Sequence, residues 1–319
     1  MSLVLVVGVP RSGTTWVGTL LGSTQDSAYV EEPDNHLTHP FAFRAKYRLP
    51  GRFYTALHPD DEAPEYERLW REALRPAARR NPSPDKARRA LCTAVWRLVA
   101  HEEIRRAFLD PNAAALKLRA AKTLAVPVTP LLPSRHVVVK SVYAALSLEW
   151  IAARFPVRVV IVRRHLLNVI SSWMELRWVG TAGNDMLDSL DPDVQDRLSA
   201  AHGVPLPEPG ASSFARGTWL LGVLDLALQD AARRHPDWLV VSHEVLCDDP
   251  ALGFRSLSHQ LGLGWTPAAE RVLDSLNRPG RGTERARLSS QLPEVWRSRL
   301  RRDQLAEIAP LLDRFGLDA

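Results

Sequence analysis

Cysteine is scarce in this chain, which has only Cys92 and Cys247 among its 319 residues. Two cysteines so far apart in the sequence offer no disulfide framework, and their separation has none of the spacings of a metal site. Both are therefore expected to be free thiols in a reducing compartment.

Long apolar runs are missing as well. No stretch of about 18 apolar residues occurs, so no membrane-spanning helix is expected. The N-terminus passes from Met1 and Ser2 directly into an apolar strand, without a basic segment or a cleavage site of small residues. These features predict a soluble cytoplasmic protein.

Lysine is rare, since only five of the 41 basic residues are lysines, and each of them is therefore worth inspecting. The net charge of +5 and the pI near 9.5 would suit a nucleic-acid partner. The basic residues instead occur as scattered arginine pairs, such as Arg79 with Arg80 and Arg301 with Arg302, and no long basic run appears. Solvated helix faces explain such pairs, so no nucleic-acid partner is expected.

Apolar strand patterns alternate with helical patterns along most of the chain. Strands are expected at residues 3–7, 28–30, 136–140, 157–162 and 238–242. Helices are expected at residues 64–80, 84–109, 144–155, 166–177, 212–235, 251–262, 266–276 and 303–315. The alternation predicts an α/β fold of the phosphate-loop, three-layer type, with a central, mostly parallel sheet flanked by helices.

The length and the 45% hydrophobic content suit one large domain with a substantial core. No internal repeat or linker interrupts the chain, so residues 1–319 are expected to form a single domain. Residues 37–60 have a loop-like composition, and residues 180–211 have the composition of an irregular insertion. Insertions near 37–130 and 180–211 are therefore expected to form an acceptor pocket or lid.

The first strand leads into a turn that suits an anion. Gly8 and Gly13 have the spacing of the nucleotide-binding loop G-x-x-x-x-G-K-S/T, with Thr15 at the final hydroxyl position. The backbone N–H groups of such a loop converge on an anion at the helix start, where the helix dipole favours negative charge. Thr14 stands where lysine is usual, and the nearest cation, Arg11, lies inside the loop. The turn therefore predicts a phosphate site with an unusually placed cation.

Other charged residues follow the remaining strands. Glu32 comes after the second strand, Lys140 ends the third, and Arg163 and Arg164 follow the fourth. The carboxyl ends of parallel strands form the ligand-binding edge of such sheets. A nucleotide kinase usually has a Mg²⁺-binding aspartate after one of these strands, whereas this chain has two arginines. The edge therefore predicts an additional anion in place of a metal ion.

Residues 10–16, with the sequence P-R-S-G-T-T-W, resemble the P-K/R-S-G-T-T-W loop of sulfotransferases that use 3′-phosphoadenosine-5′-phosphosulfate (PAPS). In that family the loop holds the 5′-phosphosulfate. The resemblance implies that the donor is bound by Arg11, Ser12, Gly13, Thr14, Thr15 and Trp16. It also implies that Trp16 stacks on adenine. The alternative interpretation is that Trp16 is a buried residue that anchors the helix.

A second run resembles the 3′-phosphate motif of the same family, in which an arginine is followed eight residues later by a hydroxyl. Arg164 with Ser172 is the preferred pair, and Arg163 with Ser171 has the same spacing and stays open. A guanidinium fork and a helix hydroxyl would bind the 3′-phosphate that ATP lacks. Leu166 stands where the family has proline.

Weaker similarities extend along the chain. Lys140 resembles the family lysine near the transferring sulfuryl group, and residues 243–250 resemble a Y-E-D-L…D-P segment. Trp296 with the arginine after it, ahead of the last helix, also fits. The basic loop that follows residue 277 adds Arg281 and Gly282 to the residues expected to bind the donor.

Glu32, Pro33 and His36 resemble the E-P-x-x-H element of carbohydrate and bacterial sulfotransferases. The resemblance implies that Glu32 is the general base, with His36 as the alternate, and a solvated pair of glutamates at 31 and 32 is the other interpretation. Val142 stands where the cytosolic small-molecule enzymes have their histidine base. Arg11 and Lys140 would stabilise the transition state electrostatically.

The implied activity is in-line transfer of a sulfuryl group from PAPS to a hydroxyl or amine of a small-molecule, glycan or lipid acceptor. Adenosine 3′,5′-bisphosphate is the implied product, and no metal is required. The competing hypotheses are a phosphate-loop kinase that uses ATP with Mg²⁺ and a non-catalytic nucleotide-binding or nucleic-acid-binding protein. The sequence does not predict the oligomeric state.

Overall fold

The computed structural model describes residues 1–76, 92, 94–109, 118, 121–123, 125–131, 133–180, 186–279 and 289–316. Its centre is a sheet of five parallel strands in the order β2-β3-β1-β4-β5. The strands are β1 (Leu3–Val7), β2 (Ser27–Glu31), β3 (His136–Ser141), β4 (Val157–Arg163) and β5 (Leu239–Ser242). The predicted three-layer α/β fold with a parallel sheet is confirmed.

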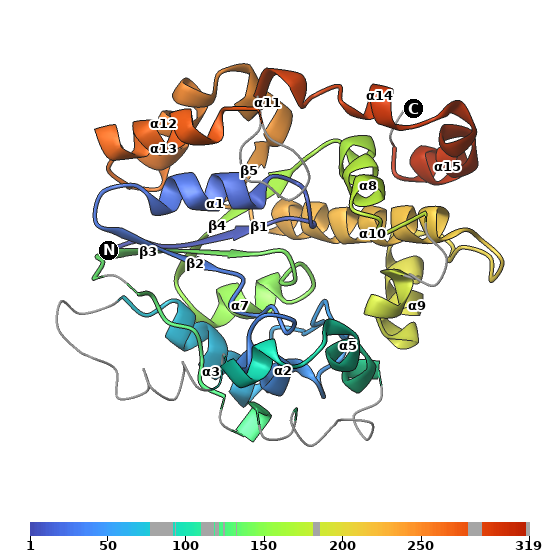
Figure 1. Cartoon of the computed structure of the whole chain (residues 1–319), viewed down its shortest axis with the longest axis horizontal. Coiled ribbons are helices and arrows are strands. Elements are labelled where there is room, and N and C mark those ends of the chain that lie inside the picture. The colour runs from blue at the N-terminus through green and yellow to red at the C-terminus, as the bar shows by residue number, and fades with distance from the viewer. Residues whose placement is uncertain are drawn as a thin grey trace.

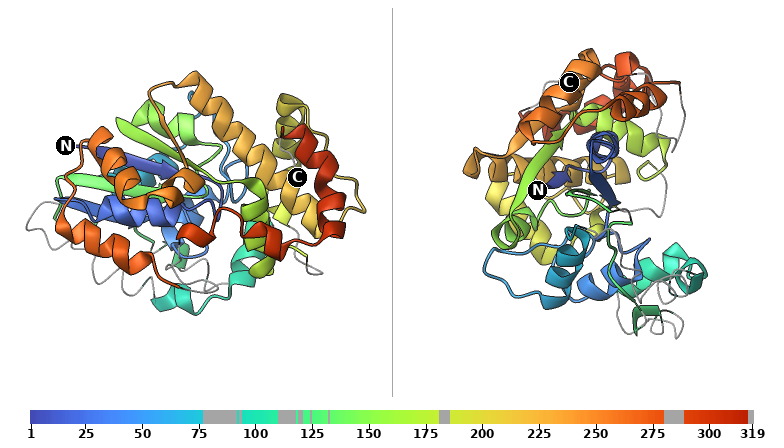
Figure 2. Two further views of the ribbon diagram at one scale, coloured as in Figure 1. Left: turned by 90° about the horizontal axis from the view of Figure 1, so that it is seen from above. Right: turned by 90° about the vertical axis from the view of Figure 1, so that its left-hand side faces the viewer.

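Helices cover both faces of the sheet (Figure 1). The upper layer in that view contains α1 (Thr14–Gly22), α11 (His243–Asp248), α12 (Pro250–Gln260) and α13 (Pro267–Leu276). The lower layer contains α2 (Pro40–Lys46), α3 (Pro64–Ala73), α5 (His101–Leu109) and α7 (Leu148–Arg154). The right-hand view of Figure 2 shows the sheet between these layers from its end.

The remaining helices gather beyond the carboxyl ends of the strands, on the right of Figure 1. They are α8 (Leu166–Glu175), α9 (Pro192–His202), α14 (Trp296–Arg299) and α15 (Arg302–Arg314). The short helix η2 (Met186–Ser189) contacts α10, and η3 (Ser289–Gln291) contacts α11. The long helix α10 (Ser213–Arg234) runs from this end back beneath the sheet. Ligand-binding loops of an open parallel sheet lie at the same end.

The strands are buried because each of their faces meets a separate apolar core. Along β1, Val4 and Val6 pack in a core with residues of α1 and α12, whereas Leu5 and Val7 belong to the larger core with α7 and α10. This two-residue alternation follows from the pleat of a strand. A strand buried on both sides reads as a continuous apolar run, which is why its pattern was easily found in the sequence.

Several predicted boundaries were wrong. Residues 37–60 contain α2, and residues 180–211 contain η2 and α9. The prolines in these segments indicated loops, but Pro40 and Pro192 occupy first-turn positions of helices, where a missing N–H group breaks no hydrogen bond. The helix expected at 144–155 begins only at Leu148, because residues 144–147 form a turn that is closed by a hydrogen bond from Ser147 N to Ala144 O.

The helix expected at 84–109 is interrupted in its described part. Residues 94–97 are helical, residues 98–100 leave the helix, and α5 begins at His101. The expected helix start at residues 83 and 84 lies outside the described residues. The last helix ends as predicted, with Gly316 in the left-handed region at φ 66°.

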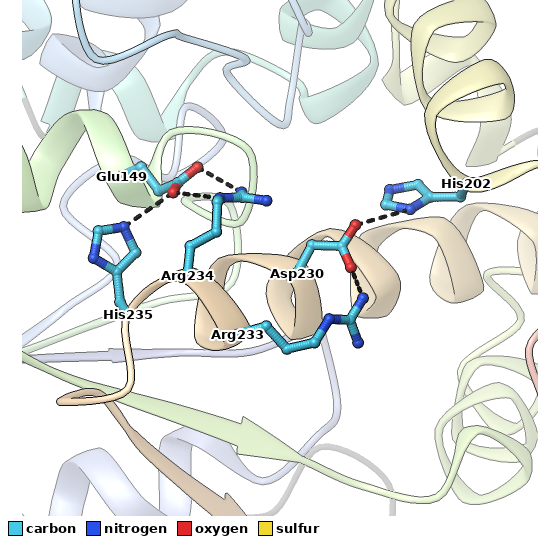
Figure 3. Close-up of polar contacts among 6 residues, drawn as sticks. All are labelled: Glu149, His202, Asp230, Arg233, Arg234 and His235. Atoms are coloured by element: carbon cyan, nitrogen blue, oxygen red, sulfur yellow. Dashed lines mark hydrogen bonds and ion pairs between the residues drawn. The ribbon is translucent and has the colours of Figure 1, made fainter.

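Two groups of polar contacts connect α10 to its neighbours (Figure 3). Glu149 of α7 accepts hydrogen bonds from Arg234, 2.8 Å from Nη2, and its other oxygen lies 3.0 Å from Nε2 of His235. Asp230 pairs with Arg233 and lies 3.3 Å from Nδ1 of His202 at the end of α9. These groups are partly exposed, so each pair stabilises the fold by about 1 kcal/mol or less.

Within the part of the chain that the structure describes, no helix combines the length and the apolar character needed to cross a bilayer.

Candidate active site

The loop between β1 and α1 is shaped by two glycines. A side chain on Gly8 would lie 2.4 Å from the carbonyl oxygen of Val162, and one on Gly13 would lie 2.4 Å from the His243 ring. Gly13 also has φ 100°, a left-handed conformation that favours glycine. Because α1 starts directly after Gly13 and no side chain caps it, the first N–H groups of the helix are available to a ligand.

A cavity of about 700 Å³ lies at the carboxyl ends of the strands. The predicted site residues on its wall are Arg11, Gly13, Thr14, Thr15, Trp16, Glu32, Lys140, Arg164 and Ser172. Ser12 is buried inside the loop instead, with its Oγ turned toward Gly8. Arg281 and Gly282 lie outside the described residues.

Two arginines and a serine meet at one side of this cavity. Arg11 Nε donates to Ser172 Oγ at 3.0 Å, and Arg164 donates from one Nη to the carbonyl oxygen of Arg11 at 3.1 Å. The pKa of Arg164 is lowered to about 10, mainly by burial; the charge of Glu244 opposes this shift, and the cations Arg11 and Arg299 add to it. The Nε of Arg164 is buried and has no hydrogen-bond partner among the described residues. A buried donor among several cations suits an anionic ligand.

The structure separates the two candidate pairs for the 3′-phosphate. Arg163 forms a bidentate salt bridge with Asp225 of α10: Nη2 donates to Oδ2 at 2.8 Å, and Nε donates to Oδ1 at 3.3 Å. Ser171 donates to the backbone oxygen of Asn168 at 3.0 Å. Of the two pairs, only Arg164 with Ser172 is on the cavity wall.

Glu32 is held at the cavity by three contacts. Lys140 Nζ donates to one oxygen of its carboxylate, Asn35 Nδ2 donates to the other at 2.7 Å, and the Glu32 N–H donates to the Lys140 carbonyl at 2.7 Å. Glu32 has φ 45°, a conformation that is strained for a residue with a side chain. Glu32 is therefore a positioned, paired carboxylate, and the interpretation as a solvated glutamate pair does not describe it.

A model of the sulfotransferase family matches residues 4–203, more than half of the chain. The chain belongs to the sulfotransferase family. This sulfotransferase is therefore an enzyme. The matched part of the chain contains the phosphate loop, Glu32, Lys140, Arg164 and Ser172 of the cavity wall.

The structure is also similar to solved sulfotransferase structures. The sulfotransferase domain of the Synechococcus PCC 7002 olefin synthase has a TM-score of 0.47 and 15% identity, over 100% of this chain and 96% of that one. The sulfotransferase domain from the curacin biosynthetic pathway has a TM-score of 0.44 and 12% identity, over 100% and 99%. Sulfotransferase STF9 from Mycobacterium avium has a TM-score of 0.38 and 15% identity, over 99% and 77%. A search of curated proteins gives no match.

His36 of the sulfotransferase lies away from the cavity wall. Its ring is fully buried, with centroid distances of 4.2 Å to Phe53 and 5.6 Å to Tyr143. Burial, and then the nearby cations Lys46 and Arg105, hold the pKa of His36 well below its usual value. The structure therefore does not bring His36 together with Glu32 on the cavity wall.

Lys46 and Asp34 form a buried polar group that the sequence did not reveal. Lys46 Nζ donates to the backbone oxygens of Asp34, at 3.1 Å, and of Phe53, at 2.6 Å. Ser141 Oγ donates to both carboxylate oxygens of Asp34, at 2.7 Å and 2.8 Å. The loop that carries Glu32 is therefore attached at two points: to the segment after α2 through Lys46, and to the end of β3 through Ser141. The scarcity of lysine was the one sequence signal that could have drawn attention to Lys46.

Arg299 is a second residue that sequence reasoning missed. It comes from α14, lies on the cavity wall, and pairs with Glu175 at 3.0 Å. Its charge also affects Arg164, so three guanidinium groups lie around the same part of the cavity. No motif distinguishes Arg299 from the other arginines near the C-terminus.

Trp16 packs against the helix layer and also reaches the cavity, and its stacking on adenine stays a prediction. It is half-buried, with ring centroids 4.8 Å from Phe254 and 5.7 Å from His243, and it also lies on the cavity wall. The tryptophan therefore anchors α1 and presents part of its ring to the cavity.

Stability is expected to fall as the pH drops below about 6.5, because His243 is buried in its neutral form. Burial, with Arg164 in addition, lowers the pKa of His243 to about 3, so the unfolded chain binds one more proton than the folded chain between these values. One such group removes about 1.4 kcal/mol of stability per pH unit. Urea unfolding at pH 7, 6 and 5 would measure how steeply the free energy of unfolding changes with pH. In His243→Asn this slope should be smaller by about 1.4 kcal/mol per pH unit. His259→Asn, which changes an exposed histidine, is the control. The same slope in His243→Asn as in this control would contradict the prediction.

Proposed function

We propose that this sulfotransferase moves a sulfuryl group from PAPS to a hydroxyl or amine of its acceptor. The observation that carries the proposal is the meeting, on one cavity wall, of the helix-start loop and the Arg164 and Ser172 pair. The two anion sites suit the two ends of a nucleotide that has both a 5′-phosphosulfate and a 3′-phosphate.

The residues fit this donor. The uncapped N-terminus of α1 would bind the 5′-phosphate through backbone N–H groups, together with the hydroxyls of Thr14 and Thr15. Arg164, whose Nε lacks a partner among the described residues, would bind the 3′-phosphate with Ser172. We include Arg299 in this set because it lies on the same cavity wall and its charge acts on Arg164, and we retain Arg281 and Gly282 as predictions.

The positions of Glu32, Arg11 and Lys140 on the cavity wall suit distinct roles in sulfuryl transfer. When bound, PAPS supplies the sulfuryl group, and adenosine 3′,5′-bisphosphate remains after transfer. Glu32 takes the proton of the acceptor hydroxyl, since its carboxylate is fixed at the wall beside Lys140. Arg11 and Lys140 offset the negative charge that develops during transfer. The hypothesis that no metal ion is needed belongs to the same proposal.

Calorimetric titration in metal-free buffer tests the donor. Adenosine 3′,5′-bisphosphate should bind, and it should bind more tightly than AMP, which lacks the 3′-phosphate. Equal binding of the two nucleotides, or no binding of either, would overturn the proposal. ATP turnover that depends on Mg²⁺ would support the kinase hypothesis instead.

Arg164→Ala is expected to weaken the binding of adenosine 3′,5′-bisphosphate by about 10- to 150-fold, because a charge-assisted hydrogen bond contributes about 1.5–3 kcal/mol. AMP affinity should change much less. Arg163→Ala is the matched control, since that arginine contacts Asp225 and is absent from the cavity wall. A larger loss in Arg163→Ala than in Arg164→Ala would reverse the assignment.

The remaining expectations belong to the same proposal. We propose that the whole chain is one catalytic domain with a cytoplasmic location. The acceptor side of the cavity receives Phe53 and Arg105 from the first predicted insertion and Met186 from the second, which supports their expected part in the acceptor pocket.

A further inference from the structure

The cavity that contains Glu32 and Lys140 is lined by a set of apolar and aromatic side chains, beside polar ones such as Asn35 and Thr38. We call this set the apolar wall, and its members come from the loops after β2, β3 and α8, from the segment after α2, and from η2. They are Leu37, Phe53, Val142, Tyr143, Trp178 and Met186. Pockets of this kind bind ligands through apolar area and orient them with a few polar groups.

The wall lies next to the proposed base. Burial raises the pKa of Tyr143, and the nearby charge of Glu32 raises it further. Val142 and Tyr143 also follow Lys140 closely in the chain, at the end of β3. A molecule whose hydroxyl reaches Glu32 would therefore place its body against these side chains.

The charges on this side balance one another. Of the described charged groups on this side, Glu31 and Glu32 line the cavity and are negative, and Lys140 and Arg105 line it and are positive. Behind the wall, Lys46 and Asp34 add one charge of each sign. Lys140 is already paired with Glu32, and Arg299, closer to the donor site, is paired with Glu175. An anionic glycan would need an excess of positive potential, which these groups do not supply.

The wall is also held in place from behind. Lys46 donates to the Phe53 carbonyl at 2.6 Å, and its ammonium lies 5.0 Å from the centroid of the Tyr143 ring. The Phe53 ring packs on the buried ring of His36. A preformed apolar surface favours binding of an apolar ligand, because little ordering of the protein is needed.

We infer that the acceptor is an uncharged, largely apolar alcohol or phenol. This inference rests on the proposed function. The acceptor hydroxyl gives its proton to Glu32, its oxygen forms the new bond to sulfur, and the bond from sulfur to the 5′-phosphate oxygen breaks. Adenosine 3′,5′-bisphosphate leaves with the electron pair of that bond.

Binding to the enzyme saturated with adenosine 3′,5′-bisphosphate tests the inference separately from the donor. The probes are 2-naphthol, 1-octanol, cellobiose and a sulfated disaccharide, each followed by a turnover assay with PAPS. The two apolar alcohols should bind and become sulfated at least about 10-fold more efficiently than either sugar. Preference for a sugar, or no binding of either alcohol to the nucleotide-bound enzyme, would overturn the inference and leave the proposed donor intact. Failure of the nucleotide itself to bind would instead refute the proposed function.

Trp178→Ala should raise the KM for 2-naphthol about 10-fold and leave the affinity for adenosine 3′,5′-bisphosphate within about twofold. Met186→Ala is a second variant with the same expected direction, and it serves where Trp178→Ala fails to fold. Trp265→Ala is the matched control, because this tryptophan is also half-buried but packs beside α13, away from the cavity wall. An unchanged KM in both wall variants would overturn the inference.

Discussion

Glu32→Gln is expected to lower turnover by about 10²- to 10⁴-fold, the usual contribution of a general base. The amide keeps the size of the side chain and an oxygen that can accept from Lys140, but it cannot take the acceptor proton. Since the proposed donor contacts come from the loop and from Arg164, the affinity for adenosine 3′,5′-bisphosphate should stay within about twofold. Single-turnover measurements with PAPS and calorimetry with the product would give both values.

Two further variants test whether the base is Glu32 or another nearby residue. Glu31→Gln removes the neighbouring carboxylate on the same wall, and it should have a much smaller effect on turnover. His36→Asn removes the alternate base, which is buried behind Phe53. If turnover survives in Glu32→Gln and is lost in His36→Asn, the role of base belongs to His36.

Lys46→Met is expected to lower the free energy of unfolding by about 3–5 kcal/mol. The lysine is fully buried, and its loss leaves the carbonyls of Asp34 and Phe53 without this donor and removes a positive charge that acts on the Asp34 carboxylate. Such a loss is a large part of the stability of an ordinary domain. Urea unfolding at pH 7 would measure it. Lys122→Met is the control, because that lysine is half-buried over the Tyr47 ring and should contribute about 1 kcal/mol or less.

A double variant would show whether Lys46 and Asp34 act together. If they do, adding Asp34→Asn to Lys46→Met should destabilise the protein by less than the sum of the two single changes, with a difference of about 0.5–3 kcal/mol. Strict additivity would mean that the ammonium stabilises only the two carbonyls.

The pH dependence provides an independent check on Lys46. Burial lowers its pKa from 10.5 to about 8, so between these values the unfolded chain binds more protons than the folded chain. The contribution of Lys46 to stability therefore rises with pH across this window. The rise should be missing from the variant, and the comparison of the two proteins removes the effects of other titrating groups.

The strands and the anion-binding loop could be predicted because their signals are local. Each strand is buried on both faces, which produces an unbroken apolar run, and the loop is marked by the spacing of Gly8 and Gly13 within one short stretch of sequence. The helices α2 and α9 were missed because proline marks both a loop and the first turn of a helix. Only the apolar contacts of the folded chain decide between these two states.

The sequence by itself determined the phosphate loop, the spacing of an arginine and a hydroxyl, and the carboxylate and lysine at the ends of neighbouring strands. The tertiary structure decided which of two adjacent arginines faces the cavity. Arg163 ends β4 and turns to Asp225 of α10, whereas Arg164, the next residue, turns to the loop. Successive side chains of a strand point to opposite faces, and an apolar run buried on both sides does not reveal which face is which. The burial of His36, the contacts of Lys46 and the approach of Arg299 depend in the same way on segments that are distant in the chain and meet only when it folds.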